Sequence, residues 1–279
     1  MKTILVPTDF SPVSKNAALY ALELAKAVAA NKIILYNAYQ APVIAEPNMP
    51  AVQIMDFDAL KSISESSLEQ LRSDIVHLCD STIELECLSE FGMLDAGIND
   101  VCESTGASII IMGISGGSNF EEVLIGSTAT SVAHNTKVPV IIVPPHAVYS
   151  PIEEIVLACD FKKVQETTPV NAIKKLLDAT KAKLYVLHVN EHQKAVDNLP
   201  YQKETFEKLL EGYHPEFHFL ENEDFVEAIN DFSQSHSVDL IITIPKKHGL
   251  FDRLFKRSHT KHLAFHTNIP LMCIHEEGL

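Results

Sequence analysis

The chain has 279 residues, 46% of them hydrophobic, and a formal net charge of -15. A domain usually has about 100 to 150 residues, so this length predicts two domains. The negative charge repels phosphate backbones and anionic lipids at long range, which argues against nonspecific binding to nucleic acid or to a membrane surface. No apolar run of the sequence approaches the ~20 residues that a membrane-spanning helix needs.

The cysteines and the N-terminal residues predict the compartment. Five cysteines occur without a CxxC pair, and several lie in apolar runs, a pattern typical of buried free thiols in a reducing environment. The stretch MKTILVPTDFS does not resemble a secretion signal, because its apolar run stops at Pro7. We therefore expect a cytoplasmic protein that binds neither nucleic acid nor membranes.

The first half of the chain alternates between β-rich runs and amphipathic stretches. Ser11 and Pro12 predict the start of the first helix, as its N-cap and first residue. The runs predicted as strands are 2–7, 32–39, 82–89, 108–115 and 138–144, and those predicted as helices are 12–30, 58–79, 96–104 and the segment from about 125. Strands separated by helix-length segments are typical of βαβ units, in which a parallel sheet is covered by helices on both faces.

The same order of runs begins again after residue 151. EEIVLACDF repeats KTILVPTDF, so that Asp160-Phe161 corresponds to Asp9-Phe10, and NIPLMCIH repeats KVPVIIVP. The second copy is shorter, and the missing length falls after its second strand. We predict two tandem doubly wound α/β domains, 1–146 and 151–279, each with a mostly parallel five-stranded sheet and helices on both faces.

Four of the chain's ten glycines lie in GISGGSNFEEVLIGST, directly after the IIIM strand. Gly113 and Gly116 lie where ligands bind in parallel sheets, and Gly126 precedes a helix whose free N–H groups favour an anion. Glycine lets a phosphate approach the backbone closely, and the hydroxyls of Ser127 and Thr128 can donate to it. The segment predicts a phosphate-binding loop, but a surface loop before a helix fits the residues equally well. The GxxxxGK[ST] and GxGxxG signatures are absent.

With these motifs the chain resembles the universal stress protein family in its tandem two-domain form. The resemblance rests on VPTDFS, IIIMG, the pattern Gly113-x-x-Gly116-x9-Gly126-Ser127 and VPVIIV. It covers residues 1 to 145 with specific motifs, whereas from 152 to 279 it depends on the strand pattern. It implies a Rossmann-like fold of the adenine nucleotide alpha hydrolase type.

The resemblance also implies a ligand and its contacts. In nucleotide-binding members this glycine pattern holds ATP, so the phosphate and ribose contacts would come from Gly113, Gly116, Gly126, Ser127 and Thr128. Asp9 would contact the adenosine, Ala38 would offer backbone groups to the adenine edge, and Pro7, Thr8 and Met112 would form the wall. The segment between the glycines contains no lysine or arginine, so Mg²⁺ would accompany the nucleotide. Asp9 also fits a second role, as a carboxylate that caps the following helix.

The second copy differs at the glycine positions. In IPKKHGLFDRLFKRSH the residues Ile244, Lys247 and Arg257 replace Gly113, Gly116 and Gly126, which predicts no ATP bound in the family manner. The basic residues of this segment suit either an anionic ligand, an acidic partner or a solvated helix face. A zinc site is conceivable, and its candidate ligands are His259, His262 and His266. No carboxylate or cysteine lies close in sequence to complete that site.

These observations predict a cytoplasmic stress-response regulator that binds ATP in its N-terminal domain. It would be at most a weak ATPase, and we assign no catalytic residue. The alternative is a nucleotide-independent interaction module whose second domain binds a partner, an anion or a metal. The resemblance implies dimerisation through the last strand, here VPVIIVP, whose exposed edge needs a partner. We therefore expect VPVIIVP and NIPLMCI to pair as an internal pseudo-dimer. The sequence does not predict whether two such chains associate as a homodimer.

Overall fold

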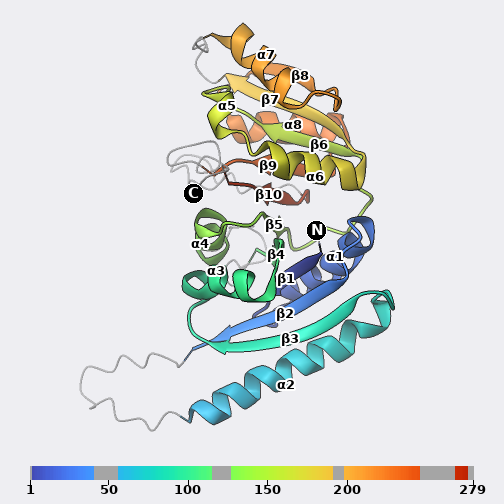
Figure 1. The fold of residues 1–279 in the computed structure, drawn as a ribbon, viewed down its shortest axis with the longest axis vertical. Coiled ribbons are helices and arrows are strands. Elements are labelled where there is room, and N and C mark those ends of the chain that lie inside the picture. The colour runs from blue at the N-terminus through green and yellow to red at the C-terminus, as the bar shows by residue number, and fades with distance from the viewer. Residues whose placement is uncertain (1, 41–55, 115–126, 191–197, 246–267, 276–279) are drawn as a thin grey trace, which may run out of the picture.

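The computed structural model describes residues 2–40, 56–114, 127–190, 198–245 and 268–275. Strands and helices alternate along both halves of the chain (Figure 1). The first half contains β1 (Thr3–Pro7), α1 (Pro12–Ala27), β2 (Lys32–Tyr39), α2 (Phe57–Ile75), the 3-10 turn η1 (Val76–Leu78), β3 (Glu84–Phe91), α3 (Leu94–Thr105), β4 (Ile109–Gly113), α4 (Ser127–Asn135) and β5 (Val140–Val143). The second half contains β6 (Glu154–Ala158), α5 (Val164–Thr167), α6 (Val170–Thr180), β7 (Lys183–Asn190), α7 (Leu199–Leu209), β8 (Glu216–Glu221), α8 (Phe225–Ser235), β9 (Leu240–Thr243) and β10 (Leu271–Cys273).

The strands of the described residues form one ten-stranded sheet in the order β3-β2-β1-β4-β5-β10-β9-β6-β7-β8. Within each half the neighbouring strands are parallel. The two halves meet through β5 and β10, which pair antiparallel with Ile141 opposite Met272. The predicted α/β class and the predicted pairing of these two segments are therefore confirmed, and the two five-stranded sheets are continuous.

Two apolar cores lie on opposite faces of this sheet. Alternating residues of each strand enter different cores, as Ile4 and Val6 do on one face and Leu5 does on the other. Helices α1, α2, α6 and α7 cover the first face, and α3, α4 and α8 cover the second. Strands buried on both faces are the reason that runs such as IIIM contain no polar residue.

Helix α1 begins as the sequence predicts, because the Ser11 hydroxyl accepts from the Ser14 N–H and Pro12 is the first helical residue. The corresponding stretch of the second half differs, since it is divided into the short α5 and the longer α6. Thr168 is extended, with φ -90° and ψ 119°, and Pro169 follows it. A residue before proline disfavours the helical conformation, so the helix is interrupted there.

The connection between β5 and β6 is attached to both halves. In the first half, the Asn16 amide donates to the carbonyls of Pro144 and Ala147 at 3.1 and 2.9 Å. In the second half, the carboxylate of Asp239 accepts from the Glu153 and Glu154 N–H groups. The connection is thus a bridge between α1 and the second half. Within the described part of the chain, no helix has the length and apolar character that crossing a bilayer requires.

Candidate functional site

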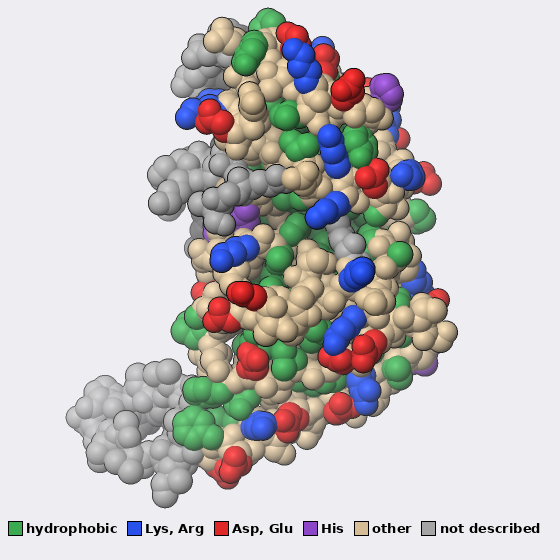
Figure 2. Space-filling view, in the orientation of Figure 1, with side chains coloured by type: hydrophobic (Ala, Val, Ile, Leu, Met, Phe, Trp, Pro, Cys, Tyr) green, Lys and Arg blue, Asp and Glu red, His purple; other side chains and the backbone are tan. Residues whose placement is uncertain are grey.

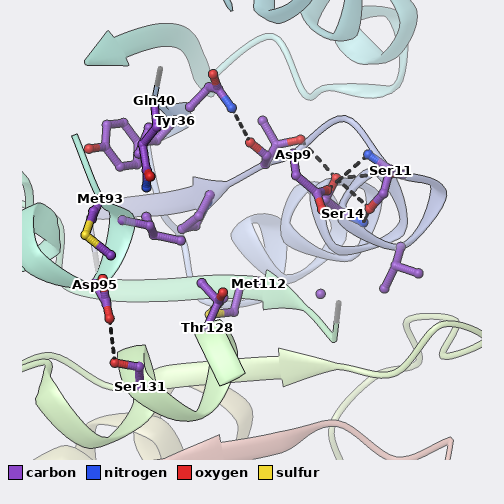
Figure 3. A pocket seen from close by; sticks show the side chains of 17 residues that line it. Asp9, Ser11, Ser14, Tyr36, Gln40, Met93, Asp95, Met112, Thr128 and Ser131 are labelled. Atoms are coloured by element: carbon purple, nitrogen blue, oxygen red, sulfur yellow. Dashed lines mark hydrogen bonds between the residues drawn. The ribbon is translucent and has the colours of Figure 1, made fainter. Parts of the chain in front are cut away.

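A cavity of about 540 Å³ lies where β1, β2 and β4 end, which is a suitable size for a nucleotide. It brings together seven of the residues predicted to bind, namely Pro7, Thr8, Asp9, Ala38, Met112, Gly113 and Thr128 (Figure 3). Gly116 and Gly126 lie outside the described residues, as does the side chain of Ser127, the first residue of α4.

The turn after β1 forms the rim of the cavity. Thr8 Oγ1 accepts from the Phe10 N–H at 3.0 Å, and Asp9 Oδ1 accepts from the Ser11 N–H at 3.1 Å. These bonds hold Phe10 in the left-handed region with φ 63°. Burial raises the pKa of Asp9, but hydrogen bonds from Ser11 and Ser14 outweigh it and leave the pKa below the usual 3.8. Ser11 is the N-cap of α1, so Asp9 supports the turn before the helix and keeps its charge at the rim.

A chain of hydrogen-bonded polar side chains lies beneath this turn. The Asn37 amide donates to the Thr8 carbonyl at 2.7 Å, and Asn37 Oδ1 accepts from the Ser64 hydroxyl at 2.7 Å. Ser64 also bonds to the Ser89 hydroxyl at 2.6 Å. Sequence reasoning missed this network, although one signal was available: Asn37 interrupts the otherwise apolar start of KIILYNAY. The network joins the cavity floor to α2 and β3.

Gly113 ends β4 beside the first turn of α1. A Cβ atom at this position would lie 2.7 Å from the Val13 carbonyl oxygen, closer than any real side chain tolerates. Glycine is therefore required by the packing of α1 against the strand, whatever the ligand. The N-terminal ends of α1 and α4 meet at this cavity, since Ser11 and Thr128 both line it. Helix N-termini carry partial positive charge and attract anions.

Residues that the sequence did not single out form the opposite wall. Asp95 and Ser131 line the cavity, and the Ser131 hydroxyl donates to Asp95 Oδ2 at 2.8 Å. Tyr36 lies nearby, where burial and the Glu90 carboxylate raise its pKa to about 12, so its hydroxyl stays protonated. Asp9 and Asp95 thus approach the cavity from different sides (Figure 3). Among the described lining residues there is no Lys, Arg or His.

The acidic side chains of the described cavity lining, Asp9 and Asp95, are the candidate ligands for a metal ion there. The described residues contain no group of three or more His, Cys, Asp or Glu side chains that could hold a metal. A cation in the cavity would therefore take most of its ligands from phosphate oxygens and water, which is the coordination that Mg²⁺ prefers. The three zinc candidates His259, His262 and His266 lie outside the described residues.

Comparison with known proteins identifies the family. The model of the universal stress protein family matches residues 1–144, just over half of the 279 residues. The chain belongs to the universal stress protein family. Universal stress protein MJ0531 of Methanocaldococcus jannaschii is 29% identical over 142 residues, which are 51% of this chain and 81% of that protein. Universal stress protein MJ0577 of the same organism is 25% identical over 153 residues, covering 51% and 94%.

A solved structure extends the likeness to both halves. The crystal structure of a universal stress protein from Archaeoglobus fulgidus DSM 4304 is similar to this chain, with a TM-score of 0.69 and 21% sequence identity. The aligned residues are 98% of this chain and 96% of that protein. At this identity the match establishes the fold. The whole chain, including the half that the family model does not reach, therefore has the fold of a universal stress protein.

The second half of this universal stress protein keeps the turn of the first. Asp160 Oδ1 accepts from the Lys162 N–H at 3.0 Å, Cys159 Sγ accepts from the Phe161 N–H at 3.3 Å, and Phe161 has φ 52°. His188 occupies the place of Asn37, with its Nδ1 atom 2.9 Å from the Cys159 carbonyl oxygen. The backbone of the turn at the rim of the first cavity is thus repeated in the second half.

The side chains around that turn have changed, however. Because β1 pairs with β4 in the register in which β6 pairs with β9, Ile244 stands where Gly113 stands in the first half. The aromatic rings of Phe206, Phe217 and Phe219 pack around Phe161 at 5.3 to 6.2 Å, and Phe219 takes the place of Ser89. Apolar rings replace the polar network of the first half. Lys247 and Arg257 lie outside the described residues.

Proposed function

We propose that this universal stress protein is a cytoplasmic stress-response regulator that binds ATP, with Mg²⁺, in the first of two domains, 1–146. The observation that carries the proposal is the cavity at the ends of β1, β2 and β4, which gathers the described members of the family's binding motif. The second domain, 151–279, would stabilise or transmit the bound state. The free state of all five cysteines agrees with a reducing compartment.

The residues around the cavity suggest how ATP would lie. The phosphates belong beside Gly113 and the N-terminus of α4, where backbone N–H groups and the Thr128 hydroxyl can donate. The adenosine belongs between Asp9, Met112 and the backbone of Ala38. Because Asp9 and Asp95 are both acidic, a bare triphosphate would be repelled, and Mg²⁺ would supply the missing positive charge.

We further propose that any ATP hydrolysis is slow. Fast phosphoryl transfer relies on cationic side chains that neutralise the developing charge. The described lining residues supply hydroxyls, amides and carboxylates for binding but no cation. The proposed role is therefore a nucleotide-dependent change of state rather than rapid turnover.

Calorimetric titration of the dialysed protein tests the binding. We expect heat with ATP and Mg²⁺, and at least tenfold weaker binding when EDTA removes the metal. Thr128→Trp would fill the cavity from an exposed helical position and should weaken binding at least tenfold. Ser66→Trp, on the exposed face of α2, is the control and should bind as the wild type does. Absence of heat with the wild-type protein would refute the proposal.

The alternative function is an interaction module that needs no nucleotide. The observation in its favour is the second half, where Ile244 and the rings around Phe161 replace the residues of the first cavity. In that case Thr128→Trp would leave the cellular activity of the protein unchanged. A stress-survival assay with this variant separates the two functions.

A further inference from the structure

An exposed group of apolar side chains lies at the rim of the cavity, and one of its members, Met93, also lines the cavity. Phe57, Phe91 and Met93 are 52%, 56% and 58% exposed, and the Phe91 ring packs edge-on against Phe57 at 5.3 Å and Tyr39 at 5.7 Å. We call these four residues the aromatic patch. Figure 2 shows apolar side chains gathered at this end of the molecule, where β2 and β3 end and α2 begins.

The core of the protein does not require the apolar side chains of the aromatic patch. Phe91 continues the face of β3 that carries Leu85, Cys87 and Ser89 toward α2, but α2 begins at Phe57 and extends no further. Folding alone would accept a polar residue at position 91, since more than half of the side chain faces solvent. Clustered large apolar side chains on a surface usually mark a docking site.

Acidic residues surround the aromatic patch. Asp56 and Asp58 flank Phe57, and Glu90 precedes Phe91, and all three are exposed. Lys61, one turn into α2, forms an ion pair with Glu65 at 3.8 Å. The surface therefore fits an occupant that carries apolar side chains together with positive charge.

This chain contains a segment of that composition. Residues 246–261 hold six of its 22 lysines and arginines together with two leucines and two phenylalanines, in a chain whose net charge is -15. The segment lies outside the described residues. We propose that the aromatic patch of one chain docks residues 246–261 of a second copy.

The sheet order favours a second copy over the same chain. The segment connects β9 to β10, and five strand spacings separate β10 from β3, which is roughly 24 Å at about 4.8 Å per spacing. Reaching the aromatic patch within one chain would require that distance twice, out and back. The connecting residues 246–267 have a fully extended length of roughly 75 Å at about 3.4 Å per residue. The path out and back would use about two thirds of that length. Docking between chains has no such restriction, and two reciprocal contacts close a symmetric dimer.

Sedimentation velocity of the full chain tests the proposal without nucleotide, so its outcome is independent of ATP binding. In low salt we expect a particle of twice 30.9 kDa that dissociates toward the monomer in 0.5 M salt, because screening weakens the charged contacts. Phe91→Ser should raise the dissociation constant at least tenfold. Val148→Ser, at an apolar side chain that is 86% exposed elsewhere, is the matched control and should not change it.

A charge exchange identifies the occupant. Asp58→Lys should weaken the dimer at least tenfold, and combining it with Lys256→Glu and Arg257→Glu should restore most of the affinity. Thermal unfolding monitored by circular dichroism verifies that each variant is folded. A monomer at every concentration, a dimer insensitive to Phe91→Ser and Asp58→Lys, or failure of the charge exchange would each overturn the proposal.

Discussion

Gly113 shows how one residue can have two reasons to be glycine. The sequence pattern attributes it to phosphate binding, whereas the structure adds the Val13 carbonyl oxygen 2.7 Å from where a Cβ atom would lie. Substitution at this position would therefore disturb α1 as well as a ligand. Asp9, Met112 and Gly113 could be predicted from sequence because they lie at the ends of strands or just past them. Asp95 and Ser131 could not, since their meeting depends on how α3 and α4 pack together.

Gly113→Ala is expected to destabilise the protein by about 1 to 3 kcal/mol, the usual cost of overpacking. Gly97→Ala is the matched control, because no atom lies within 4 Å of its added Cβ and the residue is inside α3. It should stabilise the protein by about 0.5 to 1 kcal/mol. Urea denaturation measures both. Equal effects of the two substitutions would contradict the close approach.

The charge of Asp9 should appear in a pH titration. Its hydrogen bonds lower the folded-state pKa below 3.8, so its contribution to stability is present above about pH 4 and is lost as the pH falls through the lowered value. The carboxyl carbon signal in NMR should titrate below pH 3.8. The Ser11→Ala variant, which removes one hydroxyl near this carboxylate, should shift the pKa upward. A midpoint above 3.8 in the wild-type protein would count against this assignment.

At the scale of elements, the two halves share the strand order and the turn after the first strand, but different side chains pack around that turn. The turn with positive φ occurs at Phe10 and again at Phe161. The sequence predicted that these two positions correspond, because each follows an aspartate in the repeated Asp-Phe pair. Sequence could not predict that Asn37, Ser64 and Ser89 form a network in one half while aromatic rings meet in the other. Such contacts join β2, α2 and β3, which are distant along the chain.

Ser64→Ala tests the network. Ser64 is 3% exposed, and its removal leaves Asn37 Oδ1 without this donor, which should cost about 1 to 3 kcal/mol of unfolding free energy. Ser66→Ala lies on the exposed side of the same helix and should change stability by less than about 0.5 kcal/mol. Hydrogen exchange should quicken in β2 and α2 for the first variant alone. Unchanged exchange with Ser64→Ala would show that the network is not stabilising.

For the whole molecule, the pairing of β5 with β10 could be predicted from the family resemblance and from the need of an exposed edge strand for a partner. It did not predict the attachment of the connecting segment, which depends on the Asn16 amide and on Tyr20, whose ring packs against Tyr149 at 5.2 Å. Both residues lie on α1, whose first turn borders the cavity. The helix therefore contacts the site at one end and the bridge between the halves along its length.

Asn16→Ala should loosen this bridge. Two carbonyl oxygens, of Pro144 and Ala147, would lose their donor, and the expected loss of stability is about 1 to 3 kcal/mol. Limited proteolysis should cut the connection faster, and ATP with Mg²⁺ should slow that cutting in the wild-type protein. Lys15→Ala, which removes only an exposed ion pair with Asp74, is the control. Equal cleavage rates in both variants would contradict the proposed role of Asn16.

The joining of β5 to β10 within one chain also has a thermodynamic consequence. Two separate subunits would associate only above their dissociation constant, whereas covalently linked halves meet at a fixed effective concentration. Their pairing is therefore insensitive to how much protein a cell makes. Each assembled pair contains, in constant proportion, one half with the described cavity and one half in which Ile244 and aromatic rings replace Gly113 and the polar network. Any response to abundance must come from contacts between whole chains, for which the edges left by this pairing are β3 and β8.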